Sequence, residues 1–287
     1  MDPIIIDTHS HVQFKAFNFD ADDVTKRSLK EGVWMINVGT KYETSRNGVA
    51  MAEKYPEGVF AAIGLHPIYA AAEFVKTKTD PDEGEFLIKE QEFNKERYQK
   101  LALSGSQRVV AIGEIGLDYY YKPKTTAKLQ EFKEKQKRIF MEQLDLAKEL
   151  DLPVILHCRM AHDDVIGILK LRGENRGVIH CFTGTLKQAQ EYIAMGFYIG
   201  INGIIFKFNI DDVIKNIGLE NILLETDCPY LTPLPAIALA KAGFDGYVRN
   251  EPVFIKHTIQ KIAELKGVSF DEIAKKTTQN ARKLFAI

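Results

Sequence analysis

Short runs of Ile, Val, Leu and Phe recur along the chain, and a stretch with helical spacing of apolar residues follows most of them. The candidate strands are Ile4–His9, Val33–Val38, Val59–Leu65, Val109–Glu114, Val154–His157, Gly177–His180, Phe197–Ile201 and Ile222–Asp227. Alternating strands and helices favour a parallel sheet, because a parallel pair needs a crossover connection. The pattern therefore predicts an α/β fold.

Eight strands with intervening helices in a chain of 287 residues predict a (β/α)8 TIM barrel that forms a single domain over residues 1–287. The alternative is a doubly wound open sheet, but no Gly-rich GxGxxG turn follows the first run. A long amphipathic helix is expected over 127–150. Two closing helices are expected near 252–266 and 271–285, after a loop over 229–248 that contains three prolines. Asp20 and Thr185 are candidate helix caps.

The connection after the third strand, residues 67–107, is much longer than the others. It contains a polar turn over 76–84 and a helix-like stretch over 85–103. We interpret it as an elaborated loop and crossover helix over the mouth of the barrel, and not as a second domain.

Lys plus Arg number 38 and Asp plus Glu number 39, which gives a net charge of −1. A protein that binds nucleic acid by bulk electrostatics is usually strongly basic, so any such binding here must be local. No apolar run approaches the roughly 20 residues that span a membrane. The first seven residues are too short and too acidic for a signal peptide, and three cysteines without a CxxC pair form no disulfide framework. We therefore expect a cytoplasmic protein without membrane contact.

Histidines and carboxylates stand at the ends of five of the expected strands. They are His9, His11, Glu114, His157, His180 and Asp227. Because the C-terminal ends of barrel strands meet at one face, these side chains should converge. Each alone could be a hydrogen-bonded structural histidine or a carboxylate that caps a helix. Four of the seven histidines fall in this set, however, and separate structural roles explain that placement poorly.

Imidazole nitrogens and carboxylate oxygens suit divalent ions such as Zn²⁺ and Mn²⁺, and Mg²⁺ suits part of the set. Six ligands exceed what one catalytic ion accepts while keeping a position open for water. We therefore predict two ions, roughly 3.5–4 Å apart, in a hydrolytic site. Asp227 is the best candidate to orient or deprotonate the attacking water. Cys158, Cys181 and Cys228 each follow a candidate ligand, and strand alternation should turn them toward the helices as structural thiols.

Seven short motifs stand in the order found in the TatD family of metal-dependent deoxyribonucleases, a branch of the amidohydrolase-type barrels. They are DTHSH (7–11), GLHP (64–67), GEIGLDY (113–119), LHCR (156–159), HCFTG (180–184), LETDCPYL (224–231) and RNEP (249–252). Each motif alone is weak, but all seven in this order are specific. The chain resembles the family over nearly its whole length.

The resemblance implies a mono- or binuclear site that hydrolyses phosphodiester bonds in DNA. It implies that His9, His11 and Asp227 hold one ion and that His157 and His180 hold the second. Glu114 would bridge the two ions, where many amidohydrolase relatives use a carboxylated lysine. The chain departs from the family pattern at Gln13, where many members carry an acidic residue, and in the length of residues 67–107. These departures leave the substrate contacts and the cover over the site open.

Other residues are candidates for substrate contacts. His66 is interpreted as a phosphate or leaving-group contact, with a structural hydrogen bond as the alternative. Arg159 and Arg249 could fork onto phosphate oxygens or form loop salt bridges, for Arg249 with Glu251 or Asp118.

Aromatic residues follow two of the expected strands. Tyr119, Tyr120 and Tyr121 could stack on bases or pack the rim of the barrel, and Phe206 and Phe208 flank a lysine in a similar way. With no basic stripe, single-stranded ends are more accessible to such a site than the interior of a duplex. We therefore expect a DNA exonuclease that acts on single-stranded ends; its tolerance of RNA is open, and no obligate protein partner is expected.

Two other functions are compatible with the same ligands. The first is a small-molecule hydrolase or phosphoesterase that acts on a cyclic amide, a lactone or a phosphotriester, because metal ligands determine reaction type better than substrate. The second is a non-catalytic, metal-dependent binding protein. A missing ligand would mark this second alternative, and the sequence lacks none.

Overall fold

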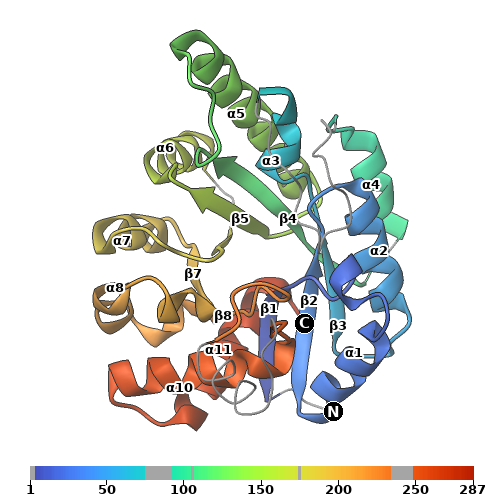
Figure 1. Ribbon diagram of the computed structural model, residues 1–287, viewed down its shortest axis with the longest axis vertical. Helices are drawn as coiled ribbons and strands as arrows, with labels where there is room; N and C mark the ends of the chain where they lie inside the picture. Colours follow the sequence, from blue (N-terminus) through green and yellow to red (C-terminus); the bar gives the residue numbers. More distant parts are fainter. Residues whose placement is uncertain (1–3, 75–91, 105–106, 174–175, 234–247) are drawn as a thin grey trace.

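The computed structural model describes residues 4–74, 92–104, 107–173, 176–233 and 248–287. Its strands are β1 (Ile5–Ser10), β2 (Val33–Val38), β3 (Val59–Ile63), β4 (Val109–Asp118), β5 (Val154–Arg159), β6 (Gly177–Ile179), β7 (Tyr198–Ile201) and β8 (Ile222–Leu224). They form one eight-stranded sheet in sequence order, and every adjacent pair from β1 to β8 is parallel. The predicted TIM barrel is confirmed (Figure 1).

The helices surround these strands (Figure 1). They are α1 (Ala21–Lys30), α2 (Tyr42–Glu53), α3 (Pro67–Ala70), α4 (Lys95–Ser104), α5 (Thr126–Glu149), α6 (His162–Arg172), α7 (Leu186–Ala194), α8 (Asp211–Asn216), α10 (Ile255–Lys266) and α11 (Phe270–Phe285). Short 3₁₀ turns are η1 (Lys15–Phe17), η2 (Ala72–Phe74), η3 (Gly203–Phe206), η4 (Leu219–Asn221) and η5 (Pro252–Phe254). Within the described residues, no helix is long and apolar enough to cross a bilayer.

Strand alternation divides the buried side chains between the barrel interior and the layer between strands and helices. On β5, Ile155 belongs to the inner cluster, whereas Leu156 and Cys158 belong to the cluster that packs against the helices. His157 follows Ile155 by two residues and therefore faces the interior. The same alternation explains why the thiol of Cys158 points away from the expected ligands.

The barrel closes where the end of β8 meets β1. The Thr8 hydroxyl donates to the Leu224 carbonyl at 2.9 Å, and the Asp227 N–H donates to the His9 carbonyl at 2.8 Å. The carboxylate of the fully buried Asp7 accepts from both the N–H and the hydroxyl of Thr226, at 2.9 and 2.6 Å. These bonds place Asp227 beside His9, although 218 positions separate the two residues in the chain.

The strand boundaries differ from the sequence prediction in a way that matters for the site. β4 continues past Glu114 because Ile115 to Asp118 still pair with Leu156 to Arg159 of β5. β8 ends at Leu224, and Asp227 has a φ of 58°, in the left-handed region that few residues other than glycine adopt. Three candidate ligands, His9, Glu114 and His157, therefore lie within strands. The other three, His11, His180 and Asp227, lie in the segments that follow strands.

The helices, helix caps and loops expected from the sequence are only partly confirmed. The long helix, the two closing helices and the Thr185 cap are confirmed, and the Thr185 hydroxyl accepts from the Gln188 N–H at 3.2 Å. Asp20 occupies the N-cap position of α1 as predicted, but its side chain makes no capping hydrogen bond and its carboxylate binds Arg249 instead. The helix expected over 85–103 is seen as α4, from Lys95. The polar turn over 76–84 and most of the loop over 229–248 lie outside the described residues.

Replacing Thr226 with Val should destabilise the barrel, because the buried Asp7 carboxylate loses a 2.6 Å hydrogen bond. We expect the free energy of unfolding to fall by about 1–3 kcal/mol. Burial raises the pKa of Asp7 to about 7, so the measurement is urea denaturation of chelator-treated protein at pH 8. The matched control is Thr25→Val, because the Thr25 hydroxyl bonds to the Ala21 carbonyl within helix α1 and to Tyr55 but to no buried carboxylate. Equal losses in the two variants would contradict this role for Asp7.

Candidate metal centre

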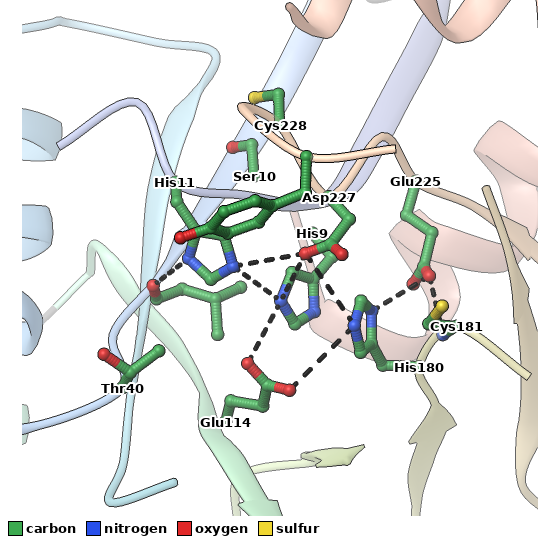
Figure 2. Close-up of polar contacts among 12 residues, drawn as sticks. His9, Ser10, His11, Thr40, Glu114, His180, Cys181, Glu225, Asp227 and Cys228 are labelled. Atoms are coloured by element: carbon green, nitrogen blue, oxygen red, sulfur yellow. Dashed lines mark hydrogen bonds and ion pairs between the residues drawn. The ribbon is translucent and has the colours of Figure 1, made fainter. Parts of the chain in front are cut away.

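The six candidate ligands converge at the mouth of the barrel, as Figure 2 shows for five of them. Four of them are almost completely buried, at no more than 4% exposure; they are His9, His11, Glu114 and His180. The six candidates and His66 form three overlapping groups, and within each group the potential ligand atoms lie within 4.8 Å of one another. The groups are His9, His11 and Asp227; His9, Glu114 and His180; and His66, Glu114 and His157.

Glu114 stands at the centre of these groups. Its Oε2 lies 3.5 Å from His9 Nε2, and its Oε1 lies 2.7 Å from His157 Nδ1 and 3.9 Å from His180 Nε2. One carboxylate thus faces imidazoles that come from β1, β5 and the turn after β6. Figure 2 shows two of them, His9 and His180.

His9, His11 and Asp227 form the group on the β1 side. The Nε2 atoms of the two histidines lie 3.2 Å apart, and His11 Nε2 lies 3.3 Å from Asp227 Oδ1. His11 Nδ1 is 2.7 Å from the Val38 carbonyl, which can only accept a hydrogen bond. The neutral ring therefore carries its proton on Nδ1, and the lone pair of Nε2 faces the cluster.

Gln13, the residue at which the chain departs from the family pattern, supports the same group. Its Nε2 donates to the Val38 carbonyl at 2.7 Å, and this carbonyl also accepts from His11. Gln13 thus helps to fix the acceptor that orients His11.

Two carboxylates orient the histidines on the opposite side. His157 Nε2 lies 3.2 Å from Asp118 Oδ2, and His180 Nδ1 lies 2.9 Å from Glu225 Oε1. The same oxygen of Glu225 accepts from the Cys181 N–H at 2.7 Å and from Asn202 Nδ2 at 2.9 Å. The other nitrogen of each histidine consequently points toward Glu114.

Asp118 and Glu225 were not assigned to the site from the sequence, although both lie in quoted motifs. Glu225 precedes Asp227 by two residues, which is the spacing of side chains on one face of a strand. That spacing was a usable signal. Asp118 reaches His157 only because β4 extends beyond Glu114, and the sequence pattern did not predict this extension.

The electrostatics of the cluster are those of buried carboxylates surrounded by imidazoles. Burial opposes charge on His157, but hydrogen bonds with Asp118 and Glu114 raise its pKa to about 9. Burial likewise opposes charge on His180, but Glu225 and Asp227 raise its pKa to about 10. The surrounding imidazoles outweigh burial at Glu114 and hold its pKa well below the usual range. Without a cation, protons on these imidazoles balance the buried negative charge.

His66 reaches the same centre from the turn before α3. Its Nδ1 accepts from the Ile68 N–H at 3.1 Å, so the proton of the neutral ring must lie on Nε2. Nε2 is 3.5 Å from Glu114 Oε1. Burial and the neighbouring His157 lower the pKa of His66 to about 3, which keeps the ring neutral. His66 therefore presents a hydrogen-bond donor to the site and not a lone pair.

The three remaining candidates lie outside this cluster. Arg249 forks onto the carboxylate of Asp20, with N–O distances of 2.9 and 2.6 Å, and therefore adopts its alternative role in a salt bridge. Tyr119 is only 5% exposed, and its hydroxyl donates to Asp164 at 2.8 Å. Arg159 is exposed, and its guanidinium lies 3.7 Å from the centre of the Tyr120 ring.

The cysteine thiols form contacts around the site and are not part of the ligand groups. Cys158 Sγ lies 3.2 Å from His162 Nδ1, and Cys181 Sγ lies 3.6 Å from Asn202 Oδ1. All three thiols are free, and none belongs to the groups of candidate ligands. This placement agrees with the expectation of structural thiols.

Comparisons with known proteins give the same family from sequence and from structure. The TatD related DNase family matches residues 6–286. The metal-dependent hydrolase YabD of Bacillus subtilis is 38% identical over 99% of this chain and 100% of its own length. The 3'-5' ssDNA/RNA exonuclease TatD of Cronobacter sakazakii is 34% identical over 98% of this chain and 97% of its own.

The solved structure of YjjV, a TatD homologue from Escherichia coli, superposes with a TM-score of 0.79 at 32% identity and covers all of both chains. Its likeness extends over the strands and turns that carry the cluster around Glu114. The chain therefore belongs to the TatD-related DNase family of metal-dependent hydrolases.

Proposed function

We propose that the centre holds two divalent ions and that the protein hydrolyses phosphodiester bonds in DNA from single-stranded ends. The observation that carries the proposal is the position of Glu114, with His9 on one side of its carboxylate and His157 on the other. A carboxylate between two sets of imidazoles is suited to bridging two ions.

The donor set fits divalent ions. The Nε2 atoms of His9 and His11 face each other at 3.2 Å deep in the protein, an arrangement that a shared cation stabilises better than a lone proton. His9, His11 and Asp227 would hold the first ion, and His157 and His180 the second, with Glu114 on both. The mixture of nitrogen and oxygen ligands is compatible with Zn²⁺, Mn²⁺ or Mg²⁺.

Ions bound here would supply Lewis acidity and make water a stronger nucleophile at neutral pH. Asp227 Oδ1 lies 3.3 Å from His11 Nε2 and 3.8 Å from His180 Nε2, at the centre of the mouth. The adjacent imidazoles outweigh burial and lower the pKa of Asp227, so its carboxylate is available to orient the attacking water or accept its proton. The Nε2–H of His66 would donate to a phosphate or leaving-group oxygen.

The choice of substrate rests on the family and on relatives such as the single-strand exonuclease of Cronobacter sakazakii. The test is digestion of single- and double-stranded oligonucleotides, labelled at either end, with added Mg²⁺, Mn²⁺ or Zn²⁺. We expect progressive shortening of the single strand. Turnover of cyclic amides, lactones or phosphotriesters without any cleavage of oligonucleotides would favour a small-molecule hydrolase instead.

Replacing Asp227 with Asn should lower kcat on an oligonucleotide by about 10²- to 10⁴-fold, because the amide cannot accept the proton of the attacking water. Circular dichroism should show an unchanged fold. The control is Asp271→Asn on the exposed first turn of α11, which should keep wild-type activity. Ordinary turnover by folded, metal-loaded Asp227→Asn would exclude the proposed role.

Metal binding should release protons and strengthen as the pH rises. In the metal-free protein the raised pKa values of His157 and His180, about 9 and about 10, keep both rings protonated at neutral pH. An incoming ion must displace these protons, so affinity should increase from pH 6.5 toward pH 9, with about two protons released per fully loaded site. Calorimetry in buffers of different ionisation enthalpy measures the release. Affinity that is independent of pH would contradict this account.

Replacing Glu225 with Gln should weaken metal binding by about 10- to 100-fold, because His180 loses the carboxylate that orients its ring. The isosteric amide keeps the volume of the side chain, so unfolding of the metal-free protein should change far less than metal affinity. Isothermal titration measures the metal affinity of the wild type and the variant, and elemental analysis measures how much metal each one holds. The control for this variant is Glu264→Gln at an exposed position of α10. Gln143→Glu is not a matched control, because it changes a buried amide in helix α5.

A further inference from the structure

Two of the three consecutive tyrosines after Glu114 are exposed beside the metal centre. Tyr120 and Tyr121 are 50% and 44% exposed, whereas Tyr119 is buried. The guanidinium of Arg159 lies over the Tyr120 ring at 3.7 Å and 5.9 Å from the centre of the Tyr121 ring. We propose that Tyr120, Tyr121 and Arg159, here called the tyrosine platform, stack the unpaired bases of a nucleic-acid strand whose scissile phosphodiester occupies the metal centre. This inference rests on the proposed function.

The tyrosine platform is fixed to the metal centre by short contacts. The Tyr120 N–H donates to Asp118 Oδ1 at 2.8 Å, and the other oxygen of that carboxylate lies 3.2 Å from His157 Nε2. Arg159 follows His157 by two residues on β5 and pairs with Asp118 of β4. Two residues of strand span roughly 7 Å, so bases next to a phosphate at His157 lie within reach of the rings.

The geometry of the aromatic side chains suits stacking. The Tyr120 and Tyr121 rings meet edge to face at 88° with centroids 4.8 Å apart, so they do not stack on each other, and Arg159 covers one face of Tyr120. Arg159 adds a planar cation to the same surface, and a guanidinium stacks on bases as well as on aromatic rings. Single exposed aromatic residues are common on proteins, but here two lie together at the mouth of a catalytic barrel.

The charge around the tyrosine platform favours a polyanion over a protein partner. Residues 119–128 read YYYKPKTTAK and contain three lysines and no acidic residue, in a chain with a net charge of −1. Lys122, Lys124 and Lys128 are all exposed. Lysines attract the phosphate backbone without reading its sequence, and aromatic faces accept any base. The tyrosine platform should therefore contribute to affinity for single strands with little preference for sequence.

The test compares the double variant Tyr120→Ala, Tyr121→Ala with the wild type on single-stranded 12-mers. We expect KM to rise by about tenfold or more while kcat stays within about twofold, because the rings bind the strand and take no part in bond cleavage. The variant Tyr120→Phe, Tyr121→Phe keeps both rings and should behave as the wild type. Leu171→Ala, an 82% exposed change at the last turn of α6, is the surface control.

Substrates that lack single bases locate the contact. A series of 12-mers carries one stable tetrahydrofuran abasic residue at successive positions from the cleaved end. The wild type should lose affinity at one or two positions near that end, and the alanine double variant should be insensitive at the same positions. Equal sensitivity in both proteins, or an unchanged KM in the double variant, would overturn the proposal and leave the rings to rim packing or to a protein partner.

A binding measurement separates this inference from the proposed function. Anisotropy of a fluorescent phosphorothioate 12-mer, which resists hydrolysis, reports affinity for the Mn²⁺-loaded protein. Suppose that the wild type binds the strand, the alanine variant does not, and the wild type cleaves no oligonucleotide. This result would refute the proposed nuclease activity and retain the tyrosine platform. Equal binding by wild type and variant, with cleavage intact, would refute the tyrosine platform alone.

Discussion

The site depends on one buried carboxylate, Glu114, held among imidazoles from several strands. Burying a carboxylate without compensation is costly, so its neighbours must supply positive charge or hydrogen bonds. His157 at 2.7 Å and His9 at 3.5 Å meet that need in the structure, and divalent ions would meet it more fully. The remaining ligands are arranged around this requirement, and Asp118 and Glu225 in turn orient the histidines.

The barrel makes this arrangement possible because it brings strand ends from the whole chain to one face. Its closure matters most where β8 meets β1, since the Asp7–Thr226 contacts place Asp227 beside His9 of β1 and His11, which follows that strand. The extension of β4 past Glu114 matters next. It carries Asp118 to His157 and then places the tyrosine platform at the rim, so β4 and β5 join the proposed strand-binding surface to the His157 side of the centre.

Much of this could be predicted from the sequence, for identifiable physical reasons. The regular alternation of apolar runs and amphipathic stretches predicted the barrel, and ligand-type residues at the ends of those runs predicted their convergence. What could not be predicted depends on contacts between distant segments. Asp20 looks like a helix cap, but Arg249, far along the chain, takes its carboxylate. Tyr119 looks as available as Tyr120 in the sequence, but in the fold it is buried and its hydroxyl donates to Asp164 of α6.

The most direct test of the account is anomalous X-ray diffraction from crystals of the protein grown with Mn²⁺ or Zn²⁺. The account predicts two anomalous peaks on either side of Glu114, roughly 3.5–4 Å apart, one near His9, His11 and Asp227 and the other near His157 and His180. A single peak that Glu114 does not touch, or peaks confined to other parts of the molecule, would contradict the proposed centre.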